Sequence, residues 1–361
     1  MVSTADEAPR PRARRPDSPR VTAATVAREA GVSTATVSLV VSGKARGRVS
    51  AGNQAKVEAA IARLGYVVDS AGSTLSKGFS PVVLLIATDI TNPFYAGLIA
   101  SARAALGERY ELLLSVSDPG SPTDPASIPR LLSQRPAGCL IHAPSAELVA
   151  RLPAGTRAVL LDAPGLAADW PTVNLDVAGG ASELARHLAG LGHRRVGYLD
   201  SVVPAETFRV RREAFRATAA ESGLEVAHPV RSLTDAGDAA RVFTEHWPAW
   251  RDAGVSVVVG CTDTHALGVL SAARAAGIGI PAELAVAGFD NLPYSRDASP
   301  GLTTVDFPAE RLGRAAGEAL RSLIEGDPAQ PPPRITLESR LIPRGSTLGP
   351  RGDDRAAADS S

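Results

Sequence analysis

Residues 21–44 read VTAATVAREAGVSTATVSLVVSGK and carry the signals of two short helices joined by a tight turn. Thr22 can cap a first helix that ends at Gly31, a residue that tolerates the positive φ of such a turn. Ser33 can cap a second helix, TATVSLVV. Four apolar residues would then face inward: Ala27, Val32, Val37 and Val40. This arrangement predicts a helix-turn-helix.

The sequence on either side of this motif supports a small, basic, all-helical unit. A third helix is predicted from about Ala51 to Leu64, with apolar residues at helical spacing to close the core. The whole chain has a formal net charge of zero, yet residues 20–80 hold eight basic residues against three acidic ones. A local basic surface on a neutral protein favours a polyanionic partner for this segment.

From Val82 onward the pattern changes to apolar β-type runs that alternate with amphipathic helical stretches. The runs are PVVLLIATD, YELLLSVSD, AGCLIHAP, RAVLLDAP, RRVGYLDS, VSVVVGCTD and ELAVAGFDN, and six of them finish on an acidic residue or in a turn that contains proline. Such alternation is typical of parallel sheets with helices on both faces. Seven strands exceed one small sheet and predict two α/β lobes, with a ligand crevice at the carboxyl ends of the strands.

Several classes of protein are disfavoured. No apolar run approaches the length of a membrane span and the first twenty residues lack the apolar core of a secretory signal, so we expect a cytoplasmic protein with no membrane partner. Cys139 and Cys261 have no CxxC spacing, and the six histidines show no metal-binding spacing, so no metal is expected. Without a nucleophile motif, phosphate loop or dinucleotide fingerprint, we expect no enzyme and no cofactor.

The headpiece sequence VTAATVAREAGVSTATVSLVVSGK, followed by VSAGNQAKVEAAIARLGY, resembles the DNA-binding headpiece of the lac repressor/GalR family. The blocks DITNPFYAGLI, FRVRREAFR, CTDTHALGVL, VAGFDN and LTTVDFPAERLG resemble that family's blocks in the family's order, so the resemblance covers roughly residues 21–343. It implies a helix-turn-helix headpiece followed by a two-lobed, periplasmic-binding-protein-like body.

The resemblance implies which residues meet DNA. The second helix would enter the major groove with Ser33, Thr34, Ala35, Ser38 and Leu39, while Thr22 and Ser42 would lie against phosphates. Where family members commonly carry Arg, this chain has Leu39, which cannot form the bidentate hydrogen bonds of Arg to guanine. We therefore expect an unusual operator. Three basic residues in the following turn are expected to contact phosphate: Lys44, Arg46 and Arg48.

The segment DSAGSTLSKG matches the family's hinge, which implies a short helix that forms on DNA and inserts Leu75 into the minor groove. Gly72 replaces the family's usual Ala and makes that helix costlier to form. A flexible linker is the alternative interpretation of this segment.

A cleft that binds a polyol needs planar hydrogen-bonding groups, carboxylates that accept hydroxyl protons and an aromatic ring for the C–H face. Five residues fit these roles and match positions that line the family's effector cleft: Asp89, Phe94, Arg211, Asp263 and Asp290. Thr262 stands where the family often has Asn, so the resemblance does not specify the hydroxyl pattern of the ligand.

The sequence thus predicts a homodimeric transcription regulator, most simply a repressor, whose affinity for a pseudo-palindromic double-stranded operator changes when a small sugar-like effector binds. An exported-type sugar-binding protein without a regulatory role is the alternative. The expected parts are a disordered Arg/Pro-rich tail (1–20), a DNA-binding domain (21–66), a hinge (67–80), a two-lobed domain for effector binding and dimerisation (81–343) and a disordered tail (344–361).

Overall fold

The structure, a computed structural model, describes residues 21–66, 80–88, 90–118, 120–166, 169–326 and 334–348. Residues 67–79 of the predicted hinge, which include Gly72 and Leu75, and the predicted effector ligand Asp89 lie outside these ranges. The chain divides after Ser80 into two compact units. None of the described helices is long and apolar enough to cross a membrane.

The first unit consists of three helices, α1 (Ala23–Ala30), α2 (Thr34–Val41) and α3 (Ala51–Leu64). Thr22 caps α1 and Gly31 ends it in the left-handed conformation with φ 66°. Ser33 accepts a hydrogen bond from the Thr36 amide and caps α2. Side chains from all three helices form one small core, in which Val26, Val37 and Val57 are fully buried. The predicted helix-turn-helix is confirmed.

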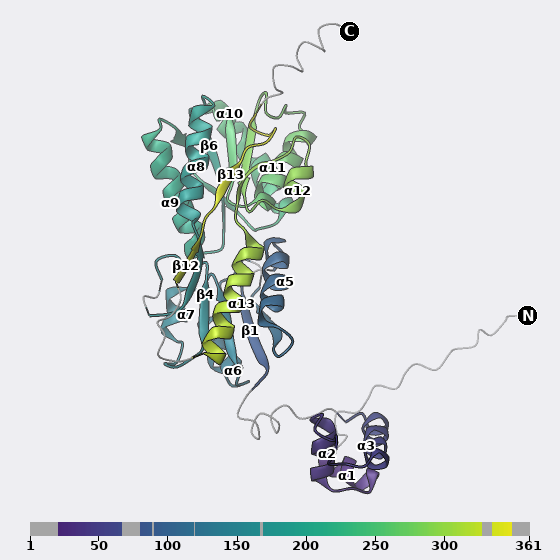
Figure 1. Cartoon of the computed structure of the whole chain (residues 1–361). Helices are drawn as coiled ribbons and strands as arrows, with labels where there is room; N and C mark the ends of the chain where they lie inside the picture. The colour runs from purple at the N-terminus through teal and green to yellow at the C-terminus, as the bar shows by residue number, and fades with distance from the viewer. Residues whose placement is uncertain are drawn as a thin grey trace, which may run out of the picture. The chain divides into compact units, whose positions relative to one another are not determined.

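The second unit contains two lobes, each a sheet covered by helices (Figure 1). The amino-terminal lobe has a six-stranded parallel sheet in the order β12-β5-β4-β3-β1-β2. Its strands are β1 (Val82–Ala87), β2 (Glu111–Val116), β3 (Gly138–His142), β4 (Ala158–Leu161), β5 (Thr172–Leu175) and β12 (Arg334–Leu337). Its helices are α5 (Phe94–Leu106), the 3₁₀ turn η1 (Pro125–Ser127), α6 (Ile128–Leu132), α7 (Ala146–Ala150) and α13 (Ala309–Glu325). The central strands β1, β3 and β4 are apolar except for His142 at the end of β3, because both of their faces are buried.

The carboxyl-terminal lobe has a sheet in the order β13-β11-β10-β9-β6-β7, with β8 also paired to β6. All pairs are parallel except β11 with β13. Its strands are β6 (Arg195–Ser201), β7 (Glu225–Val226), β8 (Val230–Ser232), β9 (Val257–Gly260), β10 (Ala285–Phe289), β11 (Thr303–Asp306) and β13 (Arg340–Ile342). Its helices are α8 (Val177–Gly190), α9 (Glu206–Glu221), α10 (Ala236–Asp252), α11 (Asp263–Ala275) and α12 (Pro293–Asp297). The predicted fold class is confirmed, and all seven predicted runs form strands.

The chain passes between the lobes three times, after β5, after β11 and after β12. Helix α13 therefore follows a strand of one lobe and packs on α5 of the other (Figure 1). The two helices approach closely at glycines: a Cβ at Gly313 would overlap the Leu98 carbonyl oxygen, and one at Gly317 would lie 2.8 Å from the Ala102 carbonyl oxygen. This contact fixes α5, whose first turn enters the site described below.

Residues 344–348 differ from the disordered tail expected there. Ser346 is fully buried, and its hydroxyl donates to the Val286 carbonyl and accepts from the Thr303 amide. The Arg344 guanidinium donates to the Asn291 side-chain oxygen at 2.7 Å. The polar, Gly-rich composition of this segment does not indicate these hydrogen bonds. The short segment belongs to the folded carboxyl-terminal lobe.

Candidate functional site

The outer surface of α2 presents small polar side chains. Ser33, Thr34, Ala35 and Ser38 are exposed, and Leu39 is half-buried. The Ser33 hydroxyl is already shared with Thr36, so its capping function and a contact with DNA would use the same oxygen. Such a surface fits a groove that is read by short side chains.

The flanking positions frame α2. Thr22 is exposed at the start of α1, whereas Ser42 is half-buried and donates its hydroxyl to the Leu39 carbonyl. The turn after α2 is held by Ala45, which is 5% exposed, while its basic side chains extend into solvent. These basic residues are Lys44, Arg46 and Arg48. Because Ala45 is buried, the turn holds three cationic side chains at the surface directly after α2.

A cavity lies between the two lobes of the second unit. Residues at or just after the carboxyl ends of strands line it from both sheets, as the crevice rule predicts: Thr88, His142, Asp162 and Leu175 from one lobe, and Val203, Thr234, Thr262, Asp290 and Phe307 from the other. The first turns of α5 and α9 supply further lining residues.

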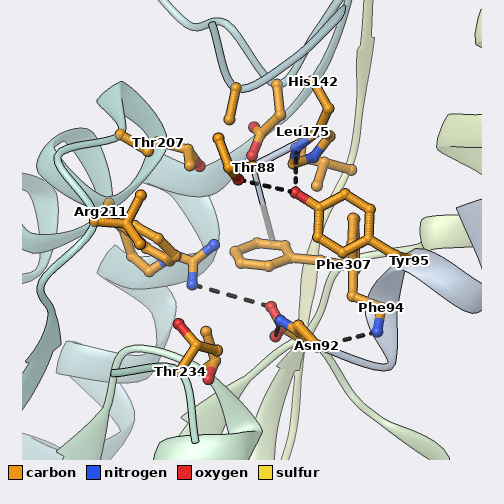
Figure 2. A pocket seen from close by; sticks show the side chains of 17 residues that line it. Thr88, Asn92, Phe94, Tyr95, His142, Leu175, Thr207, Arg211, Thr234 and Phe307 are labelled. Carbon is orange, nitrogen blue, oxygen red and sulfur yellow. Dashed lines mark hydrogen bonds and ion pairs between the residues drawn. The ribbon is translucent and has the colours of Figure 1, made fainter. Parts of the chain in front are cut away.

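Arg211 on α9 forms the centre of the carboxyl-terminal side of the cavity (Figure 2). Its guanidinium lies 5.2, 4.9 and 4.5 Å from the ring centres of Phe208, Phe289 and Phe307 and donates to the Cys261 carbonyl. One of its terminal nitrogens lies 4.0 Å from an Asp290 carboxylate oxygen. The stacked rings and the carbonyl fix the cation, so that its remaining N–H groups have a defined direction.

Asp290 is the acidic partner in this part of the cavity. It has a φ of 109°, and its other carboxylate oxygen accepts a 3.1 Å hydrogen bond from the Asn92 side chain of the opposite lobe. Burial raises the pKa of Asp290 to about 6, although the Arg211 charge and the Asn92 hydrogen bond act in the opposite direction. The Asn92 side-chain oxygen accepts from the Phe94 amide and so links Asp290 to the start of α5.

The amino-terminal side carries a chain of polar groups, visible in Figure 2. The Tyr95 hydroxyl lies 3.3 Å from the Thr88 hydroxyl and 2.9 Å from Nδ1 of His142. Burial lowers the pKa of His142, more than the nearby Asp162 charge raises it, so the imidazole is neutral at pH 7. The hydrogen bond with Tyr95 fixes Nδ1 of His142, and Nε2 remains available to a ligand.

Four buried polar atoms of the cavity lining have no protein partner within the described ranges: Nε2 of His142, Oδ1 of Asp162, the hydroxyl of Thr207 and Nε of Arg211. Buried polar groups in native proteins nearly always form hydrogen bonds. These four come from both lobes and include a carboxylate oxygen, a hydroxyl and nitrogens. The arrangement fits a ligand that both donates and accepts hydrogen bonds.

Asp263 occupies a different place from the one predicted. It is fully buried outside the cavity lining, and its oxygens accept from the Leu292 amide at 2.9 Å, the Ser295 hydroxyl at 2.5 Å and the Thr304 hydroxyl at 2.6 Å. Burial and the neighbouring Asp290 charge raise its pKa to about 8. Asp263 thus anchors the turn after β10 that carries Asp290, and its oxygens are already satisfied by the protein.

Of the predicted effector residues, the structure brings together Phe94, Arg211 and Asp290. The sequence reasoning missed Asn92, Tyr95, His142, Asp162 and Thr207, all of which line the cavity. A signal existed for two of them, because IHAP and LLDAP end predicted strands, where a crevice was expected. Within the described ranges no group of three or more His, Cys, Asp or Glu residues could hold a metal ion.

Two family models match the chain. Residues 22–69 match the model of bacterial regulatory proteins of the lacI family, and residues 185–347 match a periplasmic binding protein-like domain. The first match favours a DNA-binding regulator over an exported sugar-binding protein.

Known proteins resemble the chain along most of its length. The ribose operon repressor of Escherichia coli is 30% identical over 332 residues, which cover 89% of this chain and 98% of the repressor. A solved complex of the transcriptional regulator CelR with cellobiose is 26% identical and covers 91% of this chain and 100% of that one, with a TM-score of 0.66. The solved lac repressor dimer bound to operator shares the fold, with a TM-score of 0.73. It is 22% identical and covers 92% of this chain and 100% of that one.

Proposed function

The chain belongs to the lacI family of bacterial regulatory proteins and is a DNA-binding transcription regulator, and we propose that it is a homodimeric repressor whose operator affinity is set by a small sugar. One observation carries the proposal: the same chain holds a helix-turn-helix unit and an interlobe cavity with unpartnered polar atoms on both sides. A protein that acts on chromosomal DNA works in the cytoplasm, which is the location we propose.

For DNA, we assign α2 to the major groove, with Ser33, Thr34, Ala35, Ser38 and Leu39 toward the bases. Thr22, Ser42 and the turn with Lys44, Arg46 and Arg48 are assigned to phosphates. The exposed side chains of α2 and of the basic turn support this assignment. Leu75 is proposed as the minor-groove wedge on the strength of the family resemblance alone.

For the effector, we assign Arg211 and Asp290 to ligand hydroxyls and Phe94 to the apolar face of the ligand. Their joint position in the cavity supports the assignment. Asp89 remains a proposed ligand contact by resemblance. The named relatives, a ribose operon repressor and a regulator crystallised with cellobiose, favour a sugar over other small polar molecules.

For assembly, strand β2 is the feature that favours a second copy of the chain. It is an edge strand, and Leu113, Leu114 and Val116 on it are 48%, 43% and 43% exposed. An apolar edge strand with unpaired backbone groups invites association with another chain. The lac repressor, which shares this fold, is a dimer on its operator. A two-fold dimer would require a pseudo-palindromic operator.

The proposed function is tested by selecting duplexes from a random-sequence pool with the purified protein, then titrating the selected duplex with and without a panel of neutral sugars. We expect a pseudo-palindromic site whose affinity shifts on addition of one sugar, by a coupling of about 1 to 3 kcal/mol, and no shift in Arg211→Ala. Enrichment of no sequence, or affinity that no ligand of the panel changes, would contradict the proposal.

The dimer is tested separately by analytical ultracentrifugation. Leu113→Glu should yield monomers with weak operator binding, whereas Leu191→Glu, at a residue of similar exposure (42%) after α8, should stay dimeric. A dimeric Leu113→Glu variant would place the interface elsewhere.

A further inference from the structure

Asp200 is a buried carboxylate of the carboxyl-terminal lobe that lies outside the cavity lining. It is the last residue but one of β6, and its side chain is 1% exposed. Its Oδ2 accepts a hydrogen bond from the guanidinium of Arg212 on α9, whereas its Oδ1 has no partner among the described residues. A second cation, Arg231 on β8, lies 3.9 Å from Oδ2 and is largely exposed. A buried charge with one close partner depends on that partner.

Helix α9 carries cavity residues in its first two turns but has no side-chain cap at its start. The residue before the helix is Ala205, which offers no oxygen to the free amides. The helix packs against β6 and α8 further along, where Phe215 lies 5.5 Å from the ring of Tyr198 on β6. The start of α9, and with it Arg211, is therefore positioned by contacts that other turns of the helix make.

The ion pair adds direction to these contacts. Apolar packing is non-directional and lets a helix rotate or slide, whereas a charged hydrogen bond to a guanidinium has a defined geometry. Consecutive residues of an α-helix point about 100° apart, so Arg212 held on Asp200 turns Arg211 toward the cavity (Figure 2). A binding group has to be kept within about 0.5 Å of its productive position by the residues that support it.

We propose that the ion pair between Asp200 and Arg212 positions α9 for effector binding, so that the guanidinium of Arg211 reaches the sugar in one fixed direction. Asp200 and Arg212 are positioning residues: neither lines the cavity, and both act on the ligand through Arg211. This inference rests on the proposed function, in which a sugar occupies the cavity, and adds two residues that set the affinity for it.

The test compares sugar affinities by calorimetry at a temperature well below the Tm of every variant. The probes are D-ribose, D-glucose, D-galactose, D-xylose and cellobiose, and the sugar that binds the wild type most tightly is used throughout. Arg212→Gln removes the cation and leaves the Asp200 carboxylate buried. It should raise the dissociation constant for that sugar about tenfold to a hundredfold, because a misdirected Arg211 loses its charged hydrogen bond to the ligand.

Arg209→Gln is the matched control. It makes the same change three residues earlier on α9, at a 47% exposed side chain that pairs with Glu206 and Glu213. The dissociation constant should stay within about twofold of wild type, because exposed ion pairs contribute little. The comparison separates the buried ion pair from a general effect of losing an Arg on this helix.

A second readout separates positioning from a general loss of stability. Arg211→Lys keeps the charge of the cavity residue but not its planar guanidinium. In this background, Arg212→Gln should change the dissociation constant by less than about threefold, because both changes disable the same contact with the ligand. A general loosening of the cavity would weaken binding by the same factor in both backgrounds.

If Arg212→Gln does not fold, Asp200→Asn takes its place in every comparison, since it removes the charge and keeps the shape of the side chain. An unchanged dissociation constant in the folded variant, or equal weakening in the wild-type and Arg211→Lys backgrounds, overturns the inference alone. Binding of none of these sugars by the wild type overturns the inference together with the proposed function. Sugar binding that leaves operator affinity unchanged contradicts only the proposed function.

Discussion

Replacing Asp263 with Ala removes the anchor of the turn that carries Asp290. Three hydrogen bonds are lost, and the Leu292 amide is left buried without a partner. At about 1 to 1.5 kcal/mol for each bond, the free energy of unfolding should fall by about 3 to 5 kcal/mol. For a unit of this size each kcal/mol lowers Tm by roughly 2 to 4 °C, so a fall of roughly 6 to 20 °C is expected.

The assay is thermal unfolding followed by circular dichroism, with sugar affinity measured by calorimetry on the same samples below Tm. Asp263→Asn is the control, because its amide oxygen can still accept from the Leu292 amide; its loss in Tm should be less than half that of Asp263→Ala. Asp263→Ala should also weaken sugar binding, since Asp290 has a φ of 109° that needs support. A Tm within about 3 °C of wild type, or equal damage from both variants, would refute the anchoring role.

Three further predictions concern the cavity, the scaffold and the headpiece. Burial raises the pKa of Asp290 to about 6, so below pH 6 its carboxyl is protonated and no longer accepts a hydrogen bond as a carboxylate from the ligand. Calorimetry should show the dissociation constant of the ligand rising about tenfold per pH unit below pH 6. In Asp290→Asn the dissociation constant should not change over this pH range. Gly313→Ala should lower the free energy of unfolding by about 1 to 3 kcal/mol through overlap with α5, whereas Gly190→Ala, with open space around it, should be nearly neutral in the same melts. In the headpiece, Arg46→Ala should reduce the slope of log K against log salt concentration for operator binding by about 0.9 for each lost phosphate contact. Leu39→Arg should favour guanine at one operator position by about 1 to 3 kcal/mol. Filter binding measures both effects, at several salt concentrations for the first and on duplexes with single base changes for the second.

The headpiece was predictable because its signals are local. Thr22, Gly31 and Ser33 each act within one turn of helix, and the structure gives them the predicted capping and turn conformations. The seven apolar strands were predictable for a similar reason, since a short continuous apolar run bounded by turn signals indicates a strand. Local chemistry specifies these elements before any long-range contact forms.

The short strands were not predictable in the same way. β7, β8 and β13 have only two or three residues, and β12 forms by pairing with β5, with Arg334 opposite Thr172. Their conformation depends on a partner distant in sequence. No periodicity in so few residues can identify that partner.

Site residues show the same division. Asp263 and Asp290 each follow an apolar strand, and sequence alone assigns them the same role. The difference arises from the turn after β10, which brings donors from Leu292 and Ser295 onto Asp263 and directs Asp290 into the cavity. His142 and Asp162 carried the strand-end signal too, but their unpartnered atoms become apparent only when β3 and β4 are paired.

The three passages of the chain between the lobes affect how the protein is synthesised. The helical core of residues 21–66 is complete early in translation, whereas the amino-terminal sheet lacks its edge strand β12 until Leu337 has been made. The other lobe needs Ser346 for its last buried hydrogen bonds. Domains fold as units during synthesis. A polypeptide that stops before Arg334 would therefore contain the whole helical headpiece but lack β12, β13 and the buried hydrogen bonds of Ser346, so that neither lobe of its body would be complete.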